Sequence, residues 1–391
     1  MASAANLTVI DGKERLPQPE KNEIQPDEKG MPDLPFLALV ILLVLIGTIT
    51  VFSASYARAY QQMGNSTYYF ARQAIFAVLG TAVMLFVSRI PYHLWRTVAV
   101  PIMIGTIVCL VLVPFIGITK NGAKRWLGVT ETLGFQPSEV AKIAIIICFA
   151  SLITVYGSRM KTFKGMLPFI GILVAVCGLI ALERHFSCIL IILALGAAML
   201  FLGGVRLYWF AIGGGVAGLF AYLYLKYMGY ASDRVTAWLD PFSDPSDKGY
   251  QILQSLYAIG SGGLMGLGFG KSRQKYLYLP EEHNDYIFPI ICEEMGFVGA
   301  VAVILLFVLL IVRGYWIAMH ARDRFGALLA AGFTTHLALQ AFLNIGVVTN
   351  FLPATGISLP FFSYGGTALV FTLFEMGIIL SVSRQADNSF I

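Results

Sequence analysis

Long apolar stretches constrain this chain more than any other feature of its sequence. Ten of them occur, at roughly 35–56, 70–88, 95–116, 137–156, 166–182, 187–204, 207–228, 286–312, 326–349 and 364–383. A helix needs about 20 apolar residues to cross the hydrocarbon core of a bilayer. Because lipid offers no hydrogen-bond partner to open backbone groups, spanning segments of this kind are expected to be helical. The sequence therefore predicts an all-α polytopic membrane protein with about ten transmembrane helices.

The composition excludes several other classes of protein. Of the 391 residues, 57% are hydrophobic and only 13% are charged, whereas a soluble domain is about one quarter charged. The Lys and Arg residues behind the net charge of +5 are spread thinly between apolar stretches, so no nucleic-acid partner is expected. The five cysteines show no C-x-x-C spacing and lie in or beside apolar stretches, which indicates buried thiols rather than a zinc site or disulfides.

The distribution of Lys and Arg predicts how the chain is oriented. Ten of these residues fall in one set of short loops and six in the opposite set, and the richer set is expected on the cytoplasmic side. This places a flexible polar tail, 1–34, in the cytoplasm, followed by a membrane domain, 35–383. An even number of spans returns the C-terminal residues, 384–391, to the cytoplasm.

Three segments on the opposite, outer side are unusually rich in aromatic residues, glycine and charge. They are 117–136, 350–363 and a large extracellular loop, 229–285, between the seventh and eighth spans. Long loops in compact domains are usually functional or disordered. The amount of placed charge and aromatic surface in these loops favours function, so we expect the working face of the protein to be outside.

Two parts of the large loop have recognisable patterns. Residues 250–257 form a short amphipathic pattern, typical of a helix at the membrane interface. The run 260–272 is rich in glycine, but Met265 occupies the position where a phosphate-binding loop requires its first glycine. We interpret this run as close backbone packing, with backbone N–H groups facing a diphosphate as the alternative.

Asp285 stands where the large loop meets the eighth span. Aspartate is well suited to cap a helix, and this is the structural interpretation. A carboxylate at a membrane rim could equally act as a general base, because partial burial raises its pKa toward the useful range. His283 is a weaker candidate for the same role.

A second constellation opens the fourth span. Pro137 suits the first position of a helix, Glu139 then falls in the first turn, and Lys142 follows three residues later on the same face. A lysine one turn below the rim must face protein or water. The two residues either form a structural ion pair or line a cavity for an anionic head group.

Further polar residues lie within the predicted spans, and most are expected to hold helices together. These residues are Glu293, Glu294, His336, Gln340, Asn344 and Glu375. Segment 356–366 mixes apolar residues with Gly and Pro and is typical of a re-entrant or lid-like loop.

The chain resembles the SEDS family (shape, elongation, division and sporulation), whose members include FtsW, RodA and SpoVE, from about residue 36 onward. The resemblance depends on several motifs that occur in the family's order. They are Phe52–Ser55, Arg72-Gln73, Lys124-Arg125-Trp126, Gln136–Glu139 with Lys142, Gly249–Gln251 through Gly270, Leu279–Glu281 with Asp285, Glu293–Gly296, and Leu359–Phe361 with Ser363–Gly366. Segment 272–281 is more similar to the FtsW and SpoVE branch than to the RodA branch.

The chain departs from the family pattern at a few positions. Asn284 and Tyr286 stand where Thr and Phe are usual, and Pro289 replaces a small residue. The turn at 183–188 lacks the Pro and Gly that often flank it. These departures affect the substrate side and the outer turn after the fifth span.

The resemblance implies a peptidoglycan glycosyltransferase that polymerises lipid II into β-1,4 glycan strands at the outer face of the cytoplasmic membrane, during cell division or sporulation. Undecaprenyl diphosphate would be released with inversion at the donor carbon. Asp285 matches the family's essential acid and would be the general base. The residues expected to bind substrate are Lys142, Glu139, Arg125, Trp126, Lys124, Arg72, Arg273, Lys275 and Ser363.

No cofactor is firmly implied, although a divalent cation such as Mg²⁺ or Mn²⁺ could assist the diphosphate, and no dedicated set of metal ligands is visible in the sequence. The expected partners are a class B penicillin-binding protein and other proteins of the division machinery. A lipid II flippase or transporter is the main alternative function, but a transporter would bind its substrate near the midplane. A non-catalytic scaffold is a further alternative, and it predicts that Asp285 is dispensable.

Overall fold

The computed structural model describes residues 30–120, 123–128, 134–183, 185–227, 237–245 and 249–386. The predicted tail, 1–34, lies almost entirely outside this part of the chain, and so do parts of the outer loop 229–285 and of the C-terminal segment 384–391.

Helices form nearly all of the membrane domain. They are α1 (Leu34–Met63), α2 (Tyr68–Val87), α3 (His93–Ile116), α4 (Pro137–Tyr156), α5 (Phe163–Leu182), α6 (Phe186–Leu202), α7 (Leu207–Tyr227), α9 (Tyr250–Ser261), α10 (Ile287–Met319), α11 (Arg324–Val348) and α12 (Gly366–Ser383), with a 3₁₀ turn, η1, at Gly157–Lys161. Every predicted span coincides with one of these helices, and α9 adds the predicted amphipathic helix. Within the described residues, eight helices are long and apolar enough to cross a membrane, which confirms a multi-pass membrane protein.

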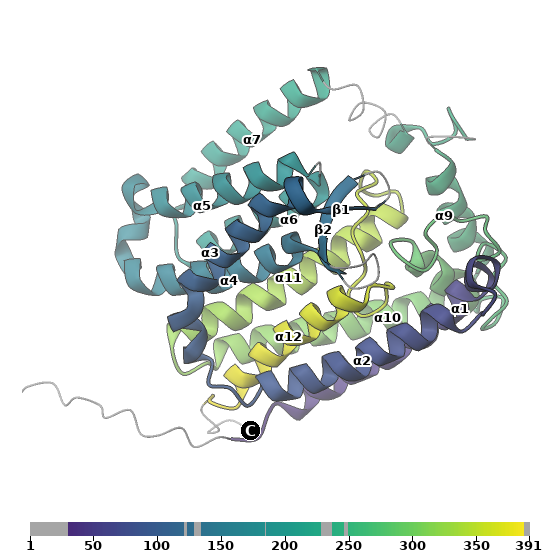
Figure 1. Ribbon diagram of the computed structural model, residues 1–391, viewed down its shortest axis with the longest axis horizontal. Coiled ribbons are helices and arrows are strands. Elements are labelled where there is room, and N and C mark those ends of the chain that lie inside the picture. The colour runs from purple at the N-terminus through teal and green to yellow at the C-terminus, as the bar shows by residue number, and fades with distance from the viewer. Residues whose placement is uncertain are drawn as a thin grey trace, which may run out of the picture.

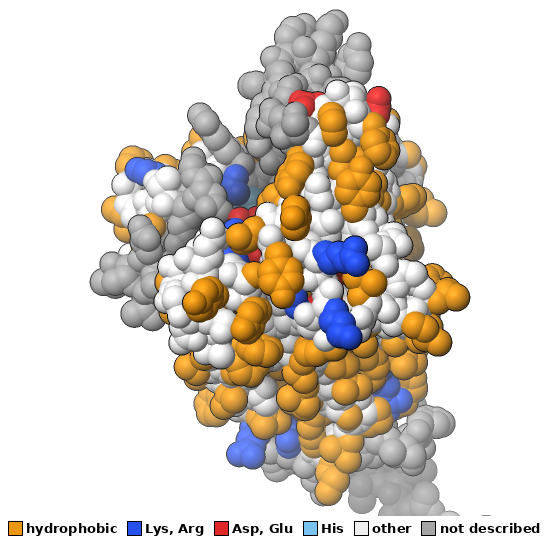
Figure 2. All heavy atoms as spheres, turned by 90° about the vertical axis from the view of Figure 1, so that its right-hand side faces the viewer, with side chains coloured by type: hydrophobic (Ala, Val, Ile, Leu, Met, Phe, Trp, Pro, Cys, Tyr) orange, Lys and Arg blue, Asp and Glu red, His pale blue; other side chains and the backbone are white. Residues whose placement is uncertain are grey.

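Helices α4 and α11 are the most deeply buried of these spans. Each packs against several neighbours, and the most extensive helix pairings among the described residues join α2 with α12, α10 with α11 and α3 with α4. Figure 1 shows the helices side by side, with α9 and the strands near one end and the C-terminal end of α12 at the other. Figure 2 shows the end of the molecule that carries α9, where Lys, Arg and acidic side chains are scattered among apolar ones. Helices that face the periphery expose large apolar side chains. This distribution suits a bundle surrounded by lipid.

The outer segment 117–136 differs from the all-α expectation because it forms a small sheet. Strands β1 (Ile118–Lys120), β2 (Ala123–Gly128) and β3 (Gly134–Phe135) pair antiparallel in the order β1-β2-β3. Pairing between these short strands satisfies the hydrogen-bonding groups of their backbone without a helix. Strand β2 carries Arg125 and Trp126 toward the helix bundle.

The glycine-rich run packs against a break in α10. Gly296 has φ 67° and ψ −167°, so the helical hydrogen bonding is interrupted there. Backbone groups of segment 262–268 replace the lost partners on both sides of the break. The N–O pairs are Leu267 to Glu293 at 2.9 Å, Gly268 to Glu294 at 3.0 Å, Phe297 to Gly263 at 2.9 Å and Val298 to Leu264 at 3.2 Å. The N–H groups of Leu267 and Gly268 and the carbonyls of Gly263 and Leu264 are therefore used within the fold, which favours the packing interpretation over a diphosphate site.

Two buried glutamates reinforce this junction. Glu293 accepts hydrogen bonds from the Ser272 hydroxyl and from the backbone N–H of Arg273 at 3.0 Å. Glu294 accepts from the Ser53 hydroxyl of α1 at 2.7 Å and from the Lys275 ammonium at 3.1 Å. A buried charge is tolerated only when it is paired and hydrogen-bonded. The pair thus fixes the second half of the outer loop against α1 and α10.

We expect Gly262→Ala to destabilise the protein strongly. A Cβ atom at this position would lie 1.9 Å from the Cys292 carbonyl oxygen, so backbone must move, and overpacking of this kind typically costs about 1–3 kcal/mol. Gly260→Ala is the matched control, because nothing lies within 4 Å of its Cβ position in the same helix. Thermal unfolding of the purified variants measures the difference. Equal melting temperatures would show that the close approach does not matter.

Candidate functional site

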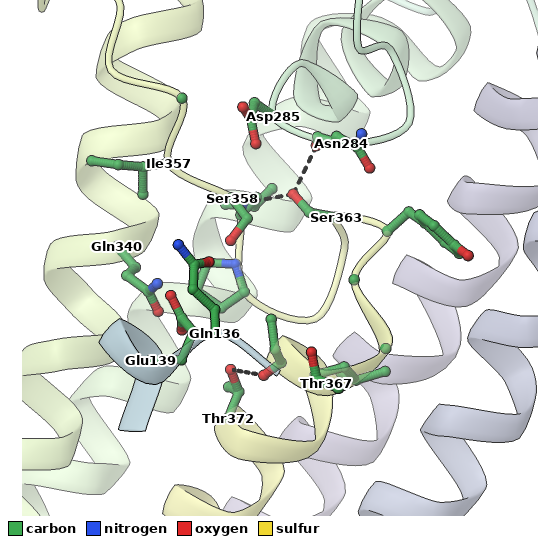
Figure 3. Close-up of a pocket in the computed structure, with 18 of the residues that line it drawn as sticks. Gln136, Glu139, Asn284, Asp285, Gln340, Ile357, Ser358, Ser363, Thr367 and Thr372 are labelled. Atoms are coloured by element: carbon green, nitrogen blue, oxygen red, sulfur yellow. Dashed lines mark hydrogen bonds between the residues drawn. The ribbon is translucent and has the colours of Figure 1, made fainter. Parts of the chain in front are cut away.

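A polar cavity of about 580 Å³ lies among the helix ends that adjoin strands β2 and β3. Its wall combines α2, strands β2 and β3, α4, α6, α11, α12, the residues just before α10 and segment 356–366. Figure 3 shows Asp285 at one end of this space and Glu139 toward the other, with Ser358 between them. Segments far apart in the sequence therefore meet at a single site.

Asp285 faces this cavity rather than capping α10. The N-cap residue of α10 is Tyr286, and no side chain caps that helix end. The Asp285 carboxylate makes no hydrogen bond within the described part of the chain, and a Cβ at Gly356 would lie 3.2 Å from its Oδ2. Burial, with a contribution from the negative charge of Glu281, raises the pKa of Asp285 to about 6. The carboxylate can therefore accept a proton near neutral pH.

Hydrogen bonds from other elements hold the backbone around Asp285. The Asn344 amide of α11 donates to the Asp285 carbonyl at 2.7 Å and to the Ile357 carbonyl at 2.6 Å. The Ser363 hydroxyl donates to the Asn284 carbonyl at 2.8 Å. One helix and the segment before α12 thus fix the position of the candidate base.

A charged pair anchors the same loop to α1. The Arg58 guanidinium binds the buried Glu282 carboxylate through two hydrogen bonds, of 2.7 and 2.6 Å. His283 is also buried, with its ring 4.8 Å from Tyr69 and 5.7 Å from Tyr364 between centroids. Burial and the nearby Arg58 charge lower the pKa of His283 to about 3. His283 does not line the cavity, so its role is to hold the loop rather than to transfer protons there.

Glu139 and Lys142 lie deeper in the cavity on α4. Their charged atoms are 2.8 Å apart, and only 2% of the Lys142 side chain is exposed. The two residues therefore form the ion pair that the sequence suggested, and both also line the cavity. Gln340 of α11 contributes a further polar group to the lining.

Two arginines face the cavity from other elements. Arg72 lies on α2, where its guanidinium donates to the Tyr68 hydroxyl at 2.9 Å. Arg125 lies on β2, and its Nε donates to the Glu183 carbonyl at 3.2 Å. Together with Lys142, they give the cavity three positively charged side chains among the described residues. Trp126 supplies an aromatic surface next to Arg125.

Three predicted substrate-binding residues do not line the cavity. The Lys124 and Arg273 side chains are exposed, Lys124 near the start of β2 and Arg273 on the surface of the loop between α9 and α10. Lys275 is buried, and its ammonium binds Glu294 and the Gly270 carbonyl, the latter at 2.7 Å. Lys275 therefore stabilises the fold, which corrects the expectation that it contacts the diphosphate.

Ser363 lines the cavity, but its hydroxyl is committed to backbone. It donates to Asn284 and accepts from the Leu359 N–H at 2.7 Å. Ser363 therefore holds the backbone at 359 and 284 together at the edge of the cavity.

The structure also adds lining residues that were not among the predicted site residues, namely Gln136, Ser358, Thr367 and Thr372. His185 belongs to this group as well. All are ordinary polar residues without a spacing that reveals a shared site. The only signal for His185 in the sequence is its position in the turn at 183–188, where the chain departs from the family pattern.

No group of three or more His, Cys, Asp or Glu side chains within the described ranges is arranged to hold a metal ion. The carboxylates that line the cavity are Asp285, Glu281 and Glu139, and Glu139 is already paired with Lys142.

Comparisons with known proteins agree with this architecture. Residues 33–388 match the family of FtsW, RodA and SpoVE, which is described as cell cycle protein. Stage V sporulation protein E of Bacillus subtilis (strain 168) is 38% identical over 363 residues, which cover 92% of this chain and 99% of that protein. The probable peptidoglycan glycosyltransferase FtsW of Geobacter metallireducens is 39% identical over 361 residues, which cover 91% of this chain and 96% of that protein.

Solved structures share the fold across nearly the whole chain. One is a chain of a peptidoglycan synthase complex, studied for its structural coordination of polymerization and crosslinking, with a TM-score of 0.77 and 26% identity; it covers 91% of this chain and 99% of that chain. The other is the rod shape determining protein RodA of Thermus thermophilus, with a TM-score of 0.68 and 26% identity, covering 91% and 98%. The likeness therefore includes the elements that build the cavity.

Proposed function

Because this chain belongs to the FtsW, RodA and SpoVE family of cell cycle proteins, we propose that it is a peptidoglycan glycosyltransferase that polymerises lipid II. The observation that carries the proposal is Asp285, a carboxylate with a raised pKa that faces a polar cavity lined by cations. Relatives named as probable peptidoglycan glycosyltransferases support the reaction class.

In the proposed reaction, Asp285 removes the proton from the 4-hydroxyl of the acceptor's terminal sugar. The hydroxyl oxygen then forms a bond with C1 of the donor sugar, while the bond from C1 to the diphosphate oxygen breaks. The configuration at C1 inverts, which gives a β-1,4 link, and undecaprenyl diphosphate leaves as an anion. General base catalysis typically contributes about 10²–10⁴-fold to such a step.

The cations of the cavity would stabilise the leaving group. Negative charge builds on the diphosphate as the C1–O bond breaks, and preorganised donors lower the barrier to that step. Arg72, Arg125 and Lys142 are the positively charged residues that line the cavity within the described ranges. A Mg²⁺ or Mn²⁺ ion would add Lewis acidity if it bound, but no group of three or more His, Cys, Asp or Glu among the described residues is arranged to hold one, so the proposed steps depend on the side chains alone.

The proposal also concerns location and partners. We place the protein in the cytoplasmic membrane with both termini inside and the cavity outside, because the Lys and Arg bias of the loops favours this orientation. A class B penicillin-binding protein is the proposed partner, since a structural neighbour is part of a complex for polymerization and crosslinking. Other division or sporulation proteins would assemble with the pair.

The test is polymerisation of purified lipid II by the reconstituted chain together with a class B penicillin-binding protein. We expect glycan strands that a muramidase digests. If a folded preparation that still binds its partner makes no glycan, the proposal is contradicted. That result is the one expected of a non-catalytic scaffold.

The pH dependence of polymerisation should report Asp285. Only the ionised carboxylate accepts a proton, so kcat/KM should rise as the pH increases through about 6, the pKa of this group. Glu281→Gln removes a negative charge that raises this pKa, so the rising limb should move to lower pH. A profile that is flat between about pH 5 and 8, or a shift to higher pH, would exclude Asp285 as the base.

A further inference from the structure

We propose that His185 donates a hydrogen bond from Nε2 to a phosphate oxygen of the lipid-linked substrate, on the cavity wall that it shares with Arg125 and Lys142. This inference rests on the proposed function and adds a specific contact for the diphosphate. His185 is the N-cap residue of α6 and lies in the turn where the chain departs from its family pattern. Its side chain lines the cavity and is partly exposed to it.

The neighbours of the ring determine which nitrogen carries the proton. The Nε2 atom of the Gln136 side-chain amide lies 3.2 Å from His185 Nδ1, and the Ser138 hydroxyl lies 3.5 Å from the same atom. An amide nitrogen can only donate, so with Gln136 oriented in this way His185 Nδ1 must accept. In a neutral imidazole the proton is then on Nε2, which makes that atom a donor.

The electrostatic surroundings keep the ring neutral. Burial and the positive charges of Arg125 and Lys142 lower the pKa of His185 to about 4, whereas Glu139 opposes this shift. The ring is therefore a neutral donor at physiological pH. Its Nε2 makes no hydrogen bond with any of the described residues, so this donor is open to a ligand in the cavity.

The charges around the ring favour an anionic ligand. Arg125 and Lys142 are both close enough to act on His185, and both line the cavity. The acidic residues nearby offset only part of this positive charge. Glu139 is paired with Lys142 at 2.8 Å, and burial raises the pKa of the Glu183 carboxyl to about 7. Phosphate oxygens are strong acceptors that match one neutral and two charged donors.

Two substitutions of His185 separate this contact from simple packing. In His185→Gln the side-chain amide nitrogen can occupy the place of Nε2 and donate, whereas the shorter amide in His185→Asn reaches only the place of Nδ1. We expect undecaprenyl diphosphate to bind His185→Asn roughly tenfold or more weakly than wild type, and His185→Gln within about threefold of wild type. Titration of the purified full-length proteins measures both affinities.

Inorganic diphosphate forms the second arm of the experiment. It should show the same order of affinities, because the contact is to phosphate and not to the lipid. Equal binding of both ligands to wild type and His185→Asn would overturn the inference. A loss of affinity confined to undecaprenyl diphosphate would overturn it too, since His185 would then act on the lipid tail and not on phosphate.

A third variant keeps the test valid if the His185 variants fail to fold. Gln136→Leu removes the amide that fixes the tautomer, so the proton can move to Nδ1 and the affinity for diphosphate should fall by a few fold. Unchanged affinity in a folded Gln136→Leu protein would count against the inference. If wild type binds undecaprenyl diphosphate through His185 yet makes no glycan, the proposed function fails and this inference stands.

Discussion

Asp285→Ala and Asp285→Asn should abolish glycan synthesis while the protein still folds and binds its partner. Loss of a general base typically lowers a rate by about 10²–10⁴-fold. Neither variant should unfold the chain, because the Asp285 carboxylate makes no hydrogen bond within the described residues, and the bonds around it use the backbone carbonyls of Asp285 and Asn284. Gel analysis of polymerised lipid II, with melting temperatures of the same preparations, measures both effects.

Asn344→Leu is the informative comparison for that experiment. It removes the amide that ties Asp285 to segment 350–365 but keeps the carboxylate. Its activity should fall less than that of Asp285→Asn, and the remaining activity should keep its rise near pH 6. Full activity of Asp285→Ala would refute the assignment of the base.

The ion pair at the base of the cavity should show a large effect of a different kind. Lys142→Met leaves the Glu139 carboxylate without its partner in a site where Lys142 itself is almost fully buried. Removing one member of a buried pair typically costs about 3–5 kcal/mol, so both stability and activity should fall. In Glu139→Gln with Lys142→Met, no charge remains unpaired, so most of the stability should return.

Activity is the readout that separates the two roles of this pair. If Lys142 contacts the diphosphate, the double variant should remain inactive although it is stable, and its KM for lipid II should rise if any turnover is left. A stable and fully active double variant would show that the pair is only structural. Thermal unfolding and steady-state kinetics of wild type, Lys142→Met, Glu139→Gln and the double variant complete the comparison.

Much of the fold could be predicted because the bilayer imposes a simple rule. A chain with long apolar stretches has to form helices, and the boundaries at 137–156 match α4 at both ends because Pro137 and Gly157 mark them. The sheet at 118–135 was not predicted, since its strands are short and lack a strict alternation of apolar and polar residues.

The residues of the candidate site could likewise be predicted only in part. Asp285, Glu139 and Lys142 could be chosen because charge is rare in this chain and each charge near an outer helix end requires an explanation. The sequence could not separate the cations of the cavity from Lys275, whose partner Glu294 lies 19 positions away on α10. His185 was missed for a related reason, because its partner Gln136 is 49 positions away.

The similarity to known proteins agrees with the branch indicated by the sequence. The named FtsW and sporulation relatives are 38–39% identical to this chain. The RodA structure shares the fold at 26% identity. We therefore propose that the protein acts in cell division or sporulation.

The central claim is that this chain performs chemistry at an outer cavity rather than moving lipid II across the membrane. The most direct measurement uses sealed vesicles that contain the oriented protein, with lipid II supplied only on the face where Asp285 is exposed. We predict that glycan strands form on that face and that one undecaprenyl diphosphate is released for each new glycosidic bond. Both products should be lost in Asp285→Asn. Lipid II that crosses to the other face without forming polymer would contradict this account and would establish a transporter.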